Sequence, residues 1–75
     1  MNAFWDTLAS AVLRAQELLA QGDVVRALTE LKQALSLAPD HPAVHRALGN
    51  AMLALGEKVR ASDYFARADS LEQKN

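Results

Sequence analysis

The 75-residue sequence has no cysteine, and it has only three glycines and two prolines. Without cysteine there is no disulfide bond, no thiolate zinc site and no cysteine nucleophile. The longest unbroken apolar run, Ala51 to Leu55, is too short to cross a bilayer. The first residues carry Asp6 and lack the basic region of a signal peptide. We therefore expect a cytoplasmic protein that does not enter a membrane.

An excess of charge of one sign is also missing. Eight Lys and Arg stand against nine Asp and Glu, which gives a net charge of -1. Binding to nucleic acid depends on basic side chains that neutralise phosphates, so the composition argues against a nucleic-acid partner. A helix that lies on a membrane surface needs a belt of basic residues, and Arg14 is the only basic residue in the first predicted helix.

Helix-forming residues dominate what is present. Ala and Leu make up 27 of the 75 residues, whereas only seven residues are β-branched. Turn signals stand at Gly22-Asp23, between Ala38 and Pro42, and at Gly56-Glu57. They predict one all-α domain over residues 1–75, with helices over about 3–21, 23–38, 42–55 and 57–72. Because the connections are short, consecutive helices should be antiparallel.

The turn residues also predict how the helices begin and end. Gly22 suits the left-handed position after a helix, and Asp23 can cap the next helix. Asp40 or His41 can cap the third helix, with Pro42 in its first turn.

The two halves of the chain repeat with an offset of 34 residues and without a gap. The identities include glycine, valine and arginine, so they do not simply reflect the richness in Ala and Leu. They include the pairs Ala9/Ala43, Leu19/Leu53, Gly22/Gly56, Val25/Val59, Arg26/Arg60, Ala27/Ala61 and Ala34/Ala68. The repeating unit is a helix, a glycine turn and a second helix.

This period and these residues resemble the tetratricopeptide repeat. In the second copy the resemblance is carried by Leu48-Gly49, Gly56, Ala61, Phe65 and Ala68; in the first copy it is carried by Gly22, Ala27, Leu31, Ala34 and Pro39. The resemblance implies two helix-turn-helix repeats stacked as a short α-solenoid. Repeat one would cover about 8–41 and repeat two about 42–75, with 3–7 as an N-terminal extension of the first helix.

The second helices of the two copies differ on one face. The first copy has apolar residues there and the second has polar residues, at the pairs Val24/Lys58, Leu28/Ser62 and Leu35/Asp69. Terminal repeats of solenoids are polar on their outer side, so we expect the stack to end with the last helix.

In a tetratricopeptide fold the first helix of each copy should line the concave surface, as the resemblance implies. Helical spacing places a mostly apolar set on that face: Trp5, Ala9, Val12, Gln16 and Leu19 from copy one, and Ala43, Arg46, Asn50 and Leu53 from copy two. An extended peptide could bind there, with Asn50 bonding its backbone and Arg46 its carboxylate. Phe4 falls instead on the stripe of Leu8, Ala11 and Ala15 that meets the second helix.

Catalytic motifs are missing from the sequence. The glycines are not arranged as a phosphate loop. His41 and His45 lack a third fixed ligand, so we expect a cap residue and a half-buried packing residue, with no metal site and no cofactor. The leading hypothesis is a non-catalytic interaction module that binds a peptide or helix, as a homodimer or as the minor subunit of a complex. The alternative is a purely structural homo-oligomerisation unit with no foreign ligand.

Overall fold

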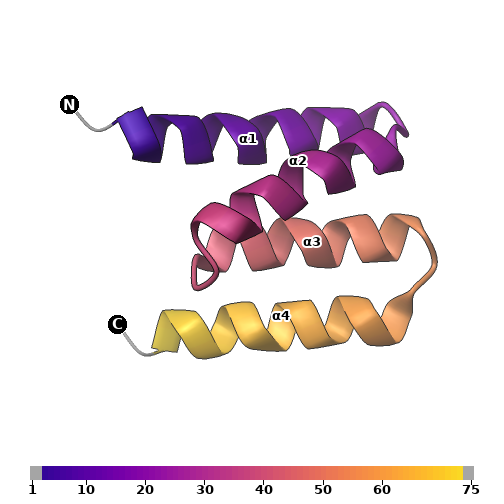
Figure 1. Ribbon diagram of the computed structural model, residues 1–75. Helices are drawn as coiled ribbons and strands as arrows, with labels where there is room; N and C mark the ends of the chain where they lie inside the picture. The colour runs from indigo at the N-terminus through magenta and orange to yellow at the C-terminus, as the bar shows by residue number, and fades with distance from the viewer. Residues whose placement is uncertain (1–2, 74–75) are drawn as a thin grey trace.

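The computed structural model describes residues 3–73, and it describes side chains over residues 7–73. Four helices follow one another: α1 (Ala3–Ala20), α2 (Val24–Leu37), α3 (Pro42–Ala54) and α4 (Lys58–Gln73) (Figure 1). No strand occurs within residues 3–73. The all-α prediction is confirmed, and each helix boundary lies within one residue of its predicted position.

The two glycine turns have the same geometry. Gly22 has a φ of 83° and Gly56 a φ of 79°, a region that L side chains rarely adopt. After each glycine, the next N–H donates to the carbonyl five residues earlier, at 2.8 Å in the first turn and 2.9 Å in the second. This pair of turns is the Schellman arrangement, which satisfies carbonyls left free at the helix end. The 34-residue repeat is therefore a repeat of backbone geometry as well as of sequence.

The predicted caps of α2 and α3 are present. The Asp23 carboxylate accepts a hydrogen bond from the Arg26 N–H at 3.4 Å. The Nδ1 of His41 accepts one from the Ala43 N–H at 3.2 Å, and Pro42 occupies the first turn of α3. Each cap satisfies a backbone donor that the first turn of a helix leaves free.

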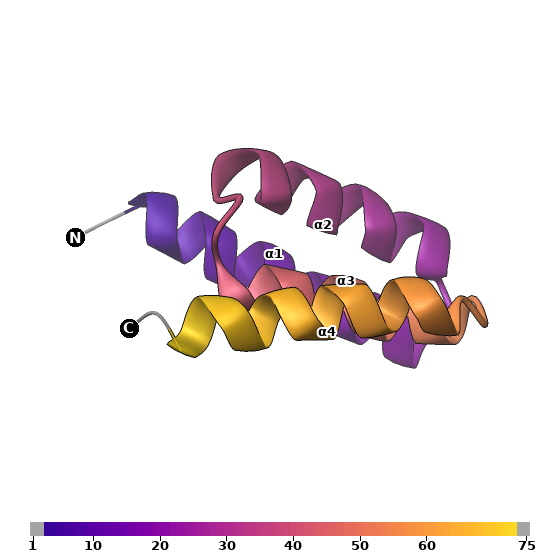
Figure 2. The same cartoon turned by 90° about the horizontal axis from the view of Figure 1, so that it is seen from below.

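The helices are arranged around α3. Its backbone approaches those of α1, α2 and α4, whereas the backbone of α4 approaches that of α3 alone among the described helices. Seen from below, α2 stands above the layer that α1, α3 and α4 form (Figure 2). The molecule therefore has a raised helix, α2, beside a lower one, α4, that it does not contact through its backbone.

The core lies where α1, α2 and α3 meet. Its largest fully buried side chains are Leu8, Leu31, Val44 and Leu48. The predicted stripe on α1 is confirmed at Leu8, Ala11 and Ala15, which are buried; the side chain of Phe4 lies outside the described residues. Ala27 and Ala61 are almost completely buried. Because their side chains are small, the helices that pack on them can approach closely.

The predicted difference between α2 and α4 is also visible. Val24, Leu28 and Leu35 of α2 are partly buried and pack against the core cluster. Their counterparts on α4 are exposed: Lys58, Ser62 and Asp69. The outward side of α4 is polar where α2 has leucines.

Candidate functional site

An apolar groove lies between α1 and the start of α3. The groove has a volume of about 470 Å³. Seven residues line it: Leu8, Ala9, Val12, Leu13 and Gln16 from α1, His41 from the loop before α3, and Ala43 from α3. Burial of apolar surface drives most association between proteins, so a groove of this composition suits an apolar partner segment.

The groove brings together part of the predicted surface. Val12 is only 8% exposed and forms its floor, while Gln16 is exposed on its wall. Leu19 is half-buried against the core, and Asn50 and Leu53 are exposed on α3; none of these three lines the groove. The side chain of Trp5 lies outside the described residues.

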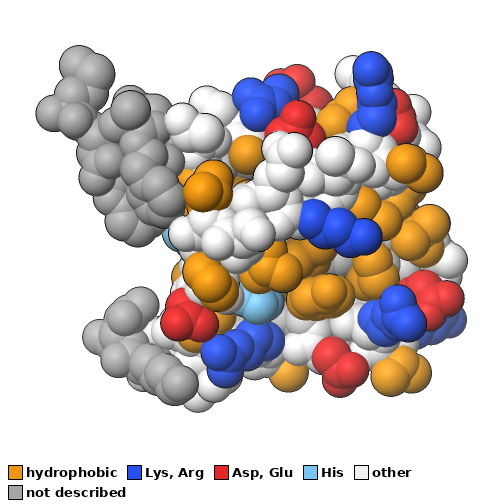
Figure 3. Space-filling view, viewed as in Figure 1, with side chains coloured by type: hydrophobic (Ala, Val, Ile, Leu, Met, Phe, Trp, Pro, Cys, Tyr) orange, Lys and Arg blue, Asp and Glu red, His pale blue; other side chains and the backbone are white. Residues whose placement is uncertain are grey.

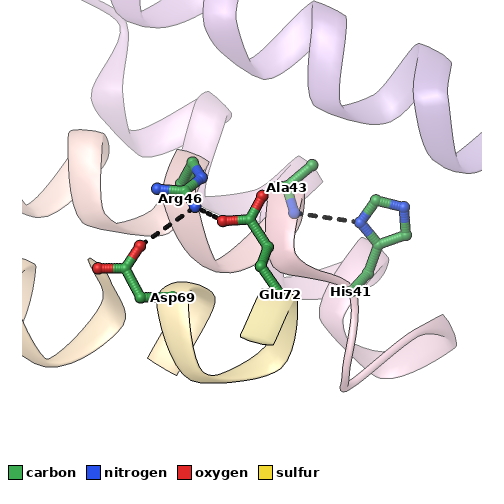
Figure 4. Close-up of polar contacts among 5 residues, drawn as sticks. All are labelled: His41, Ala43, Arg46, Asp69 and Glu72. Atoms are coloured by element: carbon green, nitrogen blue, oxygen red, sulfur yellow. Dashed lines mark hydrogen bonds and ion pairs between the residues drawn. The ribbon is translucent and has the colours of Figure 1, made fainter. Parts of the chain in front are cut away.

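Arg46 is held by acidic side chains of α4. Its Nη2 lies 3.3 Å from Asp69 Oδ1 and also contacts Glu72 Oε1 (Figure 4). Both carboxylates come from the last turns of α4, so the ion pairs tie the two helices of the second repeat together. The positive charge of Arg46 is already balanced within the chain, and a peptide carboxylate would have to compete with Asp69 and Glu72 for it.

Comparison with protein-family models gives a match to the tetratricopeptide repeat over residues 18–75. The chain belongs to the tetratricopeptide repeat family. Tetratricopeptide repeats are in general protein-interaction modules and are typically non-catalytic, and the four helices of the structure form two such repeats. The comparisons with curated proteins and with solved structures found no match.

The family match begins at Leu18, in the last turn of α1. Most of α1 therefore lies outside the matched segment, although α1 supplies most of the groove. Five of the seven residues that line the groove of this tetratricopeptide-repeat protein therefore lie outside the segment that the family model matches.

Three residues that line the groove were not predicted on this face: Leu8, Leu13 and His41. Leu8 was assigned instead to the stripe that meets the second helix. Leu13 is 59% exposed and lines the groove beside Gln16. It stands four residues after Ala9 and three before Gln16, so helical spacing could have found it. His41 could not have been found in that way, because it precedes α3 and its position depends on the loop.

The two histidines have the roles expected for cap and packing residues. His41 caps α3, and His45 is 8% exposed in the contact region of α3 and α4. The Nε2 of His45 lies 2.6 Å from the Pro39 carbonyl oxygen and donates to it, because that oxygen can only accept.

Among the described residues, no group of three His, Asp or Glu side chains could hold a metal ion. Within the same residues, no helix is long and apolar enough to span a membrane.

Proposed function

We propose that this tetratricopeptide-repeat protein is a non-catalytic interaction module that binds an extended peptide or a helix of a partner protein in the α1–α3 groove. The observation that supports this proposal most directly is the apolar lining of the groove, which α1 and α3 share. Leu13, a large apolar side chain, is exposed in this groove. Exposed apolar side chains gathered in a groove are typical of a binding surface.

The polar residues of the same face would orient the ligand. Gln16 and Asn50 are exposed and occupy equivalent positions of the two repeats, so their amides could bond successive parts of a peptide backbone. Leu19 and Leu53, also equivalent, would extend the apolar contact towards the glycine turns.

In this proposal Arg46 binds a carboxylate of the partner at the edge of the surface, and that carboxylate replaces Asp69 or Glu72. The proposal includes Trp5 because it stands seven residues before Val12 in the sequence. A cytoplasmic location and a role as a subunit of a complex are further parts of the proposal.

The experiment is a selection of random phage-displayed peptides on the immobilised protein, followed by fluorescence-anisotropy titration of the selected peptides. Leu13→Ser should weaken binding about tenfold, since a buried leucine contact contributes roughly 1.5–3 kcal/mol and part of it is lost here. Val25→Ser is the matched control, because Val25 is 76% exposed and lies on α2 away from the groove.

Equal affinity of the selected peptides for the wild type and for Leu13→Ser would contradict the proposal. An assembly that dissociates in Leu13→Ser, with no peptide recovered, would favour the structural alternative, in which a second copy fills the groove.

A further inference from the structure

A second apolar hollow lies on another face, between α2 and α4 above α3. We call it the α2–α4 trough; its volume is about 480 Å³. Its principal lining residues are Leu28, Lys32 and Leu35 of α2, Met52 of α3, Leu55 of the second glycine turn and Tyr64 of α4. Figure 3 shows hydrophobic side chains gathered there, with basic side chains beside them. The trough shares no lining residue with the α1–α3 groove.

The trough exists because α2 and α4 do not pack on each other. The backbone of α4 approaches only α3, so the leucines of α2 that face α4 are left partly covered. Beyond Tyr64 the trough continues into a hollow of about 380 Å³, which is lined by His45, Arg60, Asp63, Tyr64 and Arg67. The two hollows share Arg60 and Tyr64, so they form one continuous surface along α4.

Two unpaired charges of opposite sign stand on the two sides of this surface. All five arginines pair with carboxylates within the chain: Arg14 with Glu30, Arg26 with Asp23, Arg46 with Asp69 and Glu72, Arg60 with Glu57, and Arg67 with Asp40. Among the residues that the structure describes, Lys32 on α2 and Asp63 on α4 have no such partner, although each lines a hollow of this face. The other unpaired charges of this part of the chain, Glu17 and Lys58, do not line it.

We propose that the α2–α4 trough binds a second copy of this chain. The arrangement of the helices suits a symmetric pair, because the raised helix α2 stands beside the lower helix α4 (Figure 2). A two-fold axis between two copies places α2 of each over α4 of the other, so each ridge fills the other trough. Lys32 of one copy then faces Asp63 of the second copy, and the symmetry repeats this ion pair.

The outline of the molecule leaves room for a dimer interface of ordinary size. A stable interface covers about 800 Å² on each partner. The molecule extends 38 × 28 × 17 Å along its principal axes, so its broad side exceeds that area. Such an interface would cover Leu28, Leu35 and Leu55, the last of which is 49% exposed in the single chain. It would leave the α1–α3 groove open for a ligand.

The test is a charge swap followed by the molar mass in solution. Light scattering coupled to size exclusion, over a dilution series of the full chain, gives the dimer dissociation constant. Lys32→Glu and Asp63→Lys each place two like-charge contacts in the symmetric interface and should raise that constant about tenfold or more. The double variant should restore it to within about threefold of wild type. Lys58→Glu and Glu17→Lys make the same charge changes away from the face and should leave it unchanged.

Amide chemical shifts locate the interface independently of the molar mass. On dilution, the resonances of Lys32, Leu35, Leu55 and Asp63 should move while those of Val12 and Gln16 stay fixed. A monomer at every concentration overturns the proposal, as does a dimer that responds equally to Lys32→Glu and to Lys58→Glu. Concentration-dependent shifts at Val12 and Gln16 would overturn it too. Peptide capture by the α1–α3 groove is measured independently, because neither charge variant touches that groove.

Discussion

The ring of Phe65 on α4 lies directly over Gly49 on α3. A Cβ added to Gly49 would stand 2.6 Å from Cε1 and 2.8 Å from Cδ1 of that ring. Gly49 is buried and lies within a helix, where glycine ordinarily lowers stability. Its presence is explained by the close approach of α3 and α4, which leaves no room for a side chain.

Gly49→Ala should therefore lower stability instead of raising it. Overpacking costs about 1–3 kcal/mol, whereas Ala in a helix interior gains only about 0.5–1 kcal/mol over Gly. The free energy of unfolding from urea denaturation should fall, and Phe65→Leu in the same background should recover part of the loss. Ala66→Gly, at an exposed position of α4, calibrates the helix-propensity effect. A more stable Gly49→Ala protein would contradict the close contact.

Ala27 and Ala61 should not tolerate larger side chains. Both are almost fully buried where the two helices of each repeat cross. We expect Ala27→Leu and Ala61→Leu each to lower the free energy of unfolding by about 1–3 kcal/mol, because the added atoms force the helices apart. Ala66→Leu makes the same change at an exposed site and should have little effect. Thermal unfolding followed by circular dichroism measures all three; unchanged melting temperatures at both buried sites would speak against the repeat packing.

The two glycine turns should respond alike to substitution. Nothing lies within 4 Å of a Cβ added at Gly22 or Gly56, so only the positive φ resists a side chain. Gly22→Ala and Gly56→Ala should each cost about 1–2 kcal/mol of stability. Gly22→Asn should cost less, because Asn adopts this conformation more readily. Equal losses for Ala and Asn would show that the backbone strain does not control these positions.

The ion pairs of Arg46 should contribute little to stability. The side chains of Arg46, Asp69 and Glu72 are 42%, 63% and 52% exposed, and exposed pairs contribute at most about 1 kcal/mol. Arg46→Gln should change the free energy of unfolding by less than that, and added salt should reduce the difference. Arg26→Gln, which breaks an exposed pair within one turn, is the control. A loss above about 2 kcal/mol would assign Arg46 a structural role that its exposure does not predict.

The local parts of the fold could be predicted from the sequence, because the residues that decide them are neighbours in the chain. Gly22 and Asp23 determine their turn, and Pro42 and His41 determine the start of α3, so the helix boundaries were correct to one residue. The partners of Arg46 could not be predicted in this way. Asp69 and Glu72 lie more than twenty residues away, and their approach depends on how α4 crosses α3.

The candidate surfaces were predicted less completely, for a related reason. Helical spacing identified the face that holds Val12 and Gln16, but it could not show that Val12 is the buried floor of a groove. The sequence did not predict the α2–α4 trough. The sequence identified Leu28 and Leu35 as apolar residues on one face of the second helix. The path of α4, which stays on α3, leaves that face partly uncovered.

The central place of α3 also sets the order in which the domain can come apart. Detachment of α4 breaks its contact with α3, removes Tyr64 from the edge of the core and separates Arg67 from Asp40, but it leaves α1, α2 and α3 packed on one another. Opening of α3, by contrast, leaves α4 with no helix to pack on and removes Val44 and Leu48 from the core. We therefore expect the amide hydrogens of α3 to exchange only when the whole domain unfolds, and those of α4 to exchange through a smaller opening as well.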